Sequence, residues 1–242
     1  MIPVQTIEPP NQVLSLRLFG SEARCDSDLG SDLDILAVLD SPLTSEIATT
    51  VTAAVEALFQ RNASISWYSK ERVIEMYRAG HLFAWHLYLE SAPLTPGYRY
   101  DILKILGNPV EYTCAEEDIN SLIDILHSVP SALKKCPNNS CYEAGIIFVC
   151  LRNIALSASS LSADGLDFSR YSPYNIADTI GIPFPLNTEE YRSLIHCRLC
   201  SQRGMPYVGL KYREVISLYG KAWTWAQQIK LFVKEAKDGN SN

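Results

Sequence analysis

The stretch LFGSEARCDSDLGSDLDILAVLD, from Leu18 to Asp40, decides the fold of this chain. It holds the end of one apolar run, a Gly20-Ser21 pair, an acidic loop and a second apolar run. The runs Val13–Phe19 and Leu33–Leu39 predict two strands, and the second is expected to be central because it is almost wholly apolar. The acidic loop therefore lies between two predicted strands.

Two aspartates at the mouth of the second strand, Asp32 and Asp34, predict a metal site. Residues two apart on a strand point to the same face, so the ionised carboxylates repel each other unless a cation lies between them. A carboxylate inside an apolar strand, as at Asp34, is costly without a partner. Oxygen ligands at this spacing favour Mg²⁺, which commonly recruits substrate phosphates as further ligands. This arrangement is typical of phosphoryl and nucleotidyl transfer.

The Gly-Ser pair ahead of the loop predicts a phosphate site. Gly20 lets a phosphate approach the backbone closely, while the Ser21 hydroxyl and the neighbouring amides donate hydrogen bonds to it. Arg24 adds a charge-assisted contact. The stretch therefore combines a candidate phosphate site with a candidate metal site.

The segment FGSEARCDSDLGSDLDILAV resembles the signature of the DNA polymerase β-type nucleotidyltransferase superfamily. That signature is an apolar residue, Gly-Ser, a variable loop, and Asp-x-Asp inside a strand. The chain is similar to the small bacterial branch, which includes aminoglycoside and lincosamide nucleotidyltransferases and minimal nucleotidyltransferases. The resemblance implies that Mg²⁺ is held by Asp32 and Asp34. It also implies that ATP, or another nucleoside triphosphate, is held by residues at matching positions: Gly20, Ser21, Arg24 and Ser31.

One position departs from that pattern. The family usually supplies a third carboxylate from the next strand, but here the expected position falls on Ser64, or on Ser66 if the register slips. Three accounts stay open: another acid serves, the substrate needs no protein base, or the site binds nucleotide with little turnover. The leading acid is Glu143, which begins a helix in the second half, although Ser140-x-x-Glu143 also matches a capping box. Weaker candidates are Glu90, Glu111 and Glu116.

The order of elements predicts two domains. Strand and helix signals alternate over the first part of the chain, with a third strand at Ala63–Tyr68, and long helical patterns follow. We expect an α/β nucleotidyltransferase head with a mixed sheet at residues 1–100, and an all-α helical bundle at residues 101–242.

Short polar signals predict where helices begin. A Ser-Pro pair precedes the first long helix, and a serine follows the third strand. Two S/T-x-x-E patterns open helices of the bundle, and a second Ser-Pro pair opens a short one. The expected caps are Ser41, Ser69, Thr113 with Glu116, Ser140 with Glu143, and Ser172.

Composition and charge narrow the possible partners. The formal charge of −6 argues against a broad electrostatic grip on nucleic acid and permits cationic small molecules. No apolar run approaches the roughly 20 residues that span a bilayer, and no signal peptide is evident. The seven cysteines are irregularly spaced, so reduced thiols in a cytoplasmic protein are expected, and Cys197-x-x-Cys200 is not expected to bind zinc.

The sequence therefore predicts an enzyme that transfers a nucleoside monophosphate, most plausibly AMP from ATP, to a hydroxyl group. The expected acceptor is a small molecule such as an aminoglycoside, and Lys211 is a candidate to reach the triphosphate. The enzyme is expected to act as a monomer or homodimer. Two alternatives stay open: a protein acceptor, as for minimal nucleotidyltransferases that modify a partner toxin, and a nucleotide-binding regulator that has lost the chemistry.

Overall fold

The computed structural model of the chain describes residues 7–25, 33–95, 101–204 and 209–239. It divides into two compact units, Met1–Thr113 and Cys114–Asn242. The first unit combines strands and helices, and the regular elements described in the second are helices, which agrees with the predicted fold class.

The first unit extends beyond the boundary predicted after residue 100. Helix α5 (Ile102–Leu106) follows that point, and its Ile102 and Leu103 are buried in the core of the first unit. Just ahead of the helix, Asp101 accepts hydrogen bonds from Ser15 and Arg17 of the first strand. The segment after residue 100 therefore belongs to the first unit, because both apolar and ionic contacts hold it there.

The sheet of the first unit contains β1 (Val13–Phe19), β2 (Leu33–Leu39), β3 (Ala63–Ser69) and the two-residue β4 (Ala92–Pro93), in the order β3-β2-β1-β4. Strand β1 is antiparallel to both neighbours, whereas β2 and β3 are parallel. The sheet is mixed, as expected, and the central position predicted for Leu33–Leu39 is confirmed.

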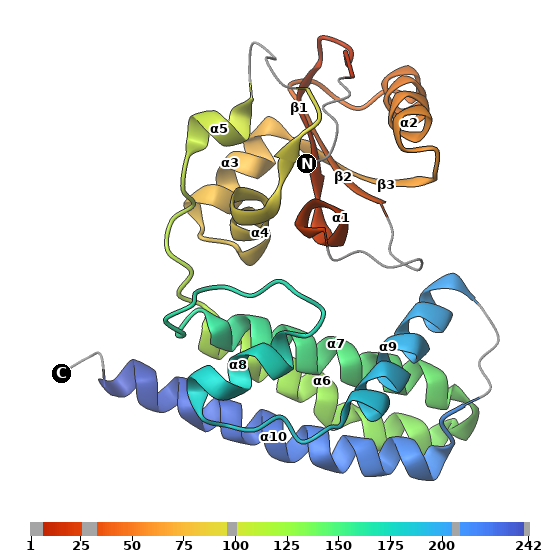
Figure 1. Cartoon of the computed structure of the whole chain (residues 1–242), viewed down its shortest axis with the longest axis vertical. Helices are drawn as coiled ribbons and strands as arrows, with labels where there is room; N and C mark the ends of the chain where they lie inside the picture. The colour runs from red at the N-terminus through yellow and green to blue at the C-terminus, as the bar shows by residue number, and fades with distance from the viewer. Residues whose placement is uncertain (1–6, 26–32, 96–100, 205–208, 240–242) are drawn as a thin grey trace. The chain divides into compact units, whose positions relative to one another are not determined.

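Helices cover both faces of this sheet (Figure 1). Helix α2 (Ser45–Phe59) packs on one face, against the side of β2 that carries Leu33, Ile35 and Ala37. Helices α3 (Lys70–Arg78), α4 (Leu82–Glu90) and α5 pack on the other, against Leu36 and Val38. Burial on both faces explains why the sequence of β2 is an almost unbroken apolar run. By the alternation of a strand, Asp34 faces the side of α3 and α4.

The second unit contains α6 (Ala115–Lys135), the short η1 (Pro137–Asn139), α7 (Ser140–Ser159), α8 (Ser172–Ile180), α9 (Thr188–Arg203) and α10 (Tyr212–Gly239). Helix α7 is its central element, since it contacts α6, α8, α9 and α10. Among the described residues, Pro137–Ser159 is the one segment long and apolar enough to cross a membrane, yet 67% of its most apolar window is buried inside the protein. That burial is the property of a core helix.

Of the predicted helix starts, one is confirmed by its side-chain bond. The Ser69 hydroxyl accepts a hydrogen bond from the backbone N–H of Arg72 and caps α3. Ser41 is not the cap of α2; Thr44 is, accepting from the N–H of Ile47. Ser172 is the first residue of α8 and gives it no cap bond, although Gly181 ends that helix in the left-handed conformation. The Ser-Pro signals located both helices and misplaced their caps by one to three residues, because several nearby residues compete for the cap position.

Both predicted capping boxes of the second unit are wrong. Helix α6 begins after Cys114 without a side-chain cap, and the Glu116 carboxylate instead accepts a hydrogen bond from Lys237 of α10 at 2.8 Å. Helix α7 also begins without a side-chain cap, and the Ser140 hydroxyl donates to the carbonyl of Pro137. Glu143 is therefore not used to cap its helix.

Gly80 is expected to be the most sensitive structural glycine of the first unit. It has a positive φ of 62° at the turn between α3 and α4, and a Cβ there would lie 2.7 Å from the carbonyl oxygen of Val110 and closer still to that of Glu111. We expect Gly80→Ala to lower the free energy of unfolding by about 3 kcal/mol, measured by urea denaturation. Gly181→Ala, also at positive φ but in open space, is the matched control and should cost about 1 kcal/mol. Equal losses in the two variants would contradict the predicted clash.

Candidate functional site

The structure brings the Gly20-Ser21 turn into contact with Asp34 of β2. Phe19, the last residue of β1, pairs with Asp34 across the antiparallel ladder. Gly20 follows with a positive φ of 74°, at the start of the short helix α1 (Gly20–Arg24). A Cβ on Gly20 would lie 2.6 Å from Oδ2 of Asp34. Glycine therefore suits this turn, because its φ is positive and the Asp34 carboxylate occupies the space that a Cβ would take.

Asp34 is placed in an apolar part of the sheet. Its neighbours Leu33, Ile35 and Leu36 are fully buried, while Asp34 itself is half-buried. Ser21 lies half-buried one residue after Gly20. The two other residues predicted for this site, Ser31 and Asp32, lie outside the described residues.

The register of the parallel strands identifies the residue opposite Asp34. Asp34 pairs with Ser64, and Leu36 with Ser66, so the unslipped register holds. Side chains paired in this way point to the same face of the sheet. The Ser64 side chain is exposed and offers a hydroxyl where the resemblance leads one to expect a carboxylate. Within the residues that the structure describes, no three His, Cys, Asp or Glu side chains gather closely enough to hold a metal ion.

Arg24, predicted to contact phosphate, forms an ion pair in this structure. Its Nη1 donates to Oε2 of Glu90 at 2.7 Å, and both side chains are less than 20% exposed. His86, one helical turn earlier on α4, lies 2.9 Å from the same carboxylate oxygen. Burial by itself raises the pKa of Glu90, but the hydrogen bonds from His86 and Arg24 outweigh it and hold that pKa below its usual value. Glu90 therefore stays ionised and compensates the charge of Arg24.

The contact between Glu90 and the Gly-Ser helix was not foreseen from the sequence. The rings of His86 and Phe19 meet edge to face with centroids 5.5 Å apart, so α4 reaches the end of β1 next to Asp34. The spacing of His86 and Glu90, four residues apart on a helix, was the available signal for their pairing. Their approach to Arg24, 62 and 66 residues away, depends on the fold and has no local signal.

Glu143 is a buried carboxylate in the first turn of α7. It is 7% exposed, and no hydrogen bond or ion pair joins it to another residue in the described part of the chain. Burial raises the pKa of Glu143 above its usual value. Holding such a group without a partner costs free energy, and perturbed carboxyl groups cluster at functional sites. With the capping role gone, Glu143 becomes the strongest acid–base candidate in the second unit.

Lys211 lies immediately before α10 and is exposed. Its backbone N–H donates to Oε2 of Glu214 at 2.7 Å, an interaction that closes the first turn of the helix. Glu143 and Lys211 thus belong to the second unit, whereas Gly20, Ser21, Arg24 and Asp34 belong to the first. The role of Lys211 at the triphosphate stays a prediction.

The contact between Gly20 and Asp34 makes a direct prediction. Gly20→Ala is expected to destabilise the first unit by about 1 to 2 kcal/mol, because the residue keeps a positive φ and the Asp34 carboxylate must shift away from the new Cβ. ATP affinity should fall at least about tenfold as the turn and the carboxylate separate. Thermal unfolding and isothermal titration with ATP measure the two effects. Unchanged ATP affinity in a folded Gly20→Ala protein would contradict a phosphate role for this turn.

Comparisons with known proteins give a likeness in structure and no match in sequence. No protein-family model matches the chain, and no curated protein matches it. Among solved structures, spectinomycin adenyltransferase AAD(9) from Enterococcus faecialis, with ATP and spectinomycin, aligns with 93% of this chain and 92% of its own. The sequence identity is 10% and the TM-score 0.46. That neighbour is a nucleotidyltransferase, and the function of the present chain is inferred from its own residues.

Proposed function

We propose that this protein is a Mg²⁺-dependent nucleotidyltransferase that moves AMP from ATP to a hydroxyl group of a small-molecule acceptor. The observation that carries the proposal is the fit of Gly20 against the Asp34 carboxylate, 2.6 Å from where a Cβ would stand. A glycine turn that ends one strand and touches an acid on the next places phosphate-binding backbone beside a metal-binding carboxylate.

Asp34, together with Asp32, would hold Mg²⁺. The residues present fit this ion, because Asp34 is an oxygen ligand that Gly20 leaves room for at the edge of an otherwise buried strand. When bound, Mg²⁺ neutralises charge on the phosphates during the displacement.

The phosphates themselves would be held by the turn. Gly20 exposes its backbone to an approaching phosphate, and the Ser21 hydroxyl donates a hydrogen bond to it. Arg24 supplies positive charge from the same short helix, positioned by its ion pair with Glu90. Ser31 and Lys211 are the further residues proposed to contact the nucleotide. Together these groups orient the α-phosphorus for attack, which is the main contribution of a protein to this reaction.

Glu143 is proposed as the general base. It would take the proton of the acceptor hydroxyl as the hydroxyl oxygen attacks the α-phosphorus; the new P–O bond forms while the bond to pyrophosphate breaks. A raised pKa suits this role, since a base works best when its pKa lies nearer the working pH. Its burial and its lack of a partner among the described residues support the assignment.

The acceptor is proposed to be a cationic small molecule such as an aminoglycoside. The formal charge of −6 favours association with such a molecule over association with nucleic acid. We further propose a cytoplasmic enzyme, monomeric or homodimeric, whose cysteines stay reduced; the described cysteines are all free thiols.

A second candidate function rests on Ser64. Because a hydroxyl stands opposite Asp34 where the third carboxylate is expected, the site is also suited to bind nucleotide with little turnover, as a regulator would. The variant Ser64→Asp distinguishes the enzyme from the regulator. Ser64 is exposed, so the protein should tolerate the change. A regulator of this kind should gain Mg²⁺-dependent turnover in Ser64→Asp, whereas an enzyme that relies on Glu143 should change little.

The proposed function is tested with ATP labelled at the α-phosphate, Mg²⁺ and a panel of aminoglycosides. The expected result is a labelled acceptor together with an equal amount of pyrophosphate, and neither product without Mg²⁺. Nucleotide binding without pyrophosphate from any acceptor would overturn the enzyme and favour the regulator. Label recovered on a co-expressed protein, with no small-molecule product, would move the acceptor from a small molecule to a protein.

A further inference from the structure

A cavity lies at the far end of the parallel strands, away from Asp34. Strand β2 continues through a loop into α2, which covers one face of the sheet, while β3 continues directly into α3, which covers the other. Neighbouring parallel strands whose following helices leave toward opposite faces open a crevice at their carboxyl ends, and small ligands commonly bind in such crevices. A cavity of about 390 Å³ occupies this position, within the usual size range of ligand pockets.

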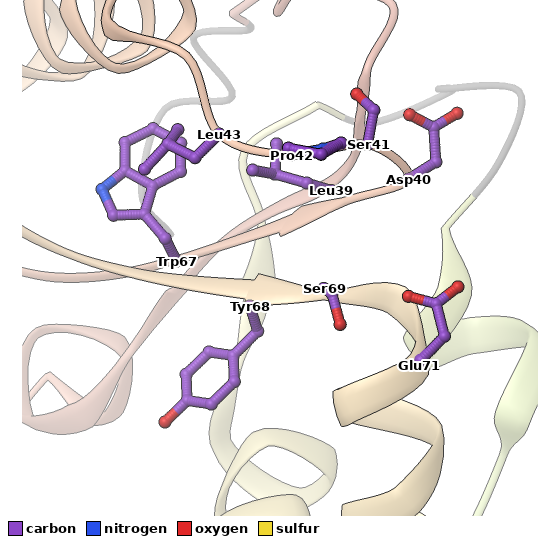
Figure 2. A pocket seen from close by; sticks show the side chains of 9 residues that line it. All are labelled: Leu39, Asp40, Ser41, Pro42, Leu43, Trp67, Tyr68, Ser69 and Glu71. Carbon is purple, nitrogen blue, oxygen red and sulfur yellow. The ribbon is translucent and has the colours of Figure 1, made fainter.

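The walls of this cavity have two chemically different sides (Figure 2). Trp67 of β3 and Leu43 of the loop lie toward one side of the pocket, with Leu39 and Pro42 between the sides. The carboxylates of Asp40, which follows β2, and Glu71, in the first turn of α3, lie toward the other side. The pocket is therefore apolar and aromatic at one end and acidic at the other.

The charge of the lining selects the kind of ligand. The two residues of the lining that carry a charge at neutral pH, Asp40 and Glu71, are both acids, and both are exposed to solvent. An anion would be repelled by them, whereas an ammonium group gains from both charges. The half-buried indole of Trp67, at the other end, adds an aromatic surface against which the apolar or aromatic body of a ligand can pack.

This pocket is separate from the candidate catalytic site. Six residues of extended strand separate Asp34 from Asp40, which corresponds to roughly 20 Å at 3.3 Å per residue. A ligand in the pocket cannot present a hydroxyl for direct attack on a phosphate held at Gly20 and Asp34. Occupancy of the pocket is therefore independent of the proposed nucleotidyl transfer.

We propose that this pocket binds a small organic cation, an ammonium group carried on an apolar or aromatic body. The body packs against Trp67 and Leu43, and the ammonium group lies at the acidic end beside Asp40 and Glu71. The chemical class follows from the two-sided lining and from the volume, which accommodates a ligand of fragment size.

Benzylamine, a cation at neutral pH, is the probe for this site. The full-length protein labelled with ¹⁵N is titrated with benzylamine, and the indole N–H signal of Trp67 is followed after its assignment by Trp67→Phe. We expect a saturable shift of this signal with a dissociation constant on the order of 1 mM. The signals of Trp223 and Trp225, in the second unit, should not move. No shift of the Trp67 signal up to about 20 mM benzylamine would overturn the proposal.

Two comparisons test the charge preference. Benzyl alcohol and benzoate keep the ring and replace the ammonium by a neutral and an anionic group, so both should bind at least about fivefold more weakly. The double variant Asp40→Asn with Glu71→Gln, changed at two exposed positions, should bind benzylamine more weakly by a similar factor. Asp124→Asn, an exposed acid on α6, is the control and should bind like the parent protein. Equal binding of the three probes, or parental affinity in the double variant, would refute the proposed cation site.

Discussion

Asp34→Asn is expected to lower nucleotidyl transfer by on the order of 10³-fold while leaving the protein folded. Asparagine keeps the shape of aspartate but cannot neutralise a bound cation, so Mg²⁺ and the triphosphate lose their shared anchor. Because asparagine has nearly the same volume and shape as the half-buried Asp34 side chain, the apoprotein should stay folded. The measurements are pyrophosphate release, Mg²⁺-dependent ATP binding and thermal unfolding.

The same experiment includes the outcome that would contradict the metal assignment. Asp124→Asn removes one exposed carboxylate from the second unit and should retain parental activity. If Asp34→Asn keeps more than about a tenth of the activity and its Mg²⁺ dependence, Asp34 is not a metal ligand. A large loss of unfolding free energy in Asp34→Asn would instead assign it a structural role at the turn.

Glu143→Gln is expected to raise stability and abolish turnover at the same time. Burial raises the pKa of this carboxyl, so replacing it by a neutral amide should increase the free energy of unfolding at pH 7, by less than about 1 kcal/mol because solvent screens part of the effect. If Glu143 is the general base, kcat should fall by about 10²- to 10⁴-fold with little change in ATP affinity. A capping role predicts the opposite stability change, a loss of about 1 kcal/mol.

The pH dependence of the two proteins gives a further test of Glu143. Its raised pKa means that the folded protein holds this proton more tightly than the unfolded chain does. Relative to the Gln variant, the wild type should therefore lose stability as pH rises from the ordinary value of 4.5 through the raised pKa. Activity follows the opposite direction, since the base works only when ionised, so the wild type should lose kcat as pH falls through that pKa.

A matched control separates the effect of burying Glu143 from the effect of having an acid in the first turn of a helix. Glu189→Gln changes an exposed acid in the first turn of α9 and should alter neither kcat nor stability by more than about 0.5 kcal/mol. Stability of Glu143→Gln that tracks the wild type across the whole pH range would show that the Glu143 carboxyl is not perturbed. If Glu143→Gln retains its kcat, Glu143 is not the general base, and the account in which the substrate needs no protein base is favoured.

Local sequence patterns were enough to locate the strands, the Gly20-Ser21 turn and one helix cap. Each of these features is encoded by a few neighbouring residues. The three strands were predicted to within one residue, since continuous apolar runs bounded by polar residues are typical of buried strands. The Gly20-Ser21 turn and Asp34 were also found from sequence alone, and the structure joins them through the pairing of Phe19 with Asp34. Ser69 was identified correctly as a cap because its partner, Arg72, is only three residues away.

The same local patterns failed where another contact competes. Glu116 matches a capping box, yet Lys237 of α10 takes its carboxylate, and no pattern near Glu116 encodes that partner. Ser140 and Glu143 match a second one, and there the competing contact is local: the Ser140 hydroxyl donates to the carbonyl of Pro137, and α7 begins without a side-chain cap. A capping box needs only a free side chain nearby, so competing contacts override it whenever they are stronger.

By itself, the sequence determined the α/β head, the Gly20-Ser21 turn after the first strand and the place of Asp34 on the second. That these residues hold a phosphate and a cation stays a prediction. Only the tertiary structure decided that Ser64 stands opposite Asp34, that Glu90 pairs with Arg24, and that the ends of β2 and β3 enclose a pocket between Trp67 and Glu71. The physical reason is sequence separation. Turns and strands are encoded by neighbours, whereas strand register, ion pairs between elements and cavities form only when segments tens of residues apart pack together.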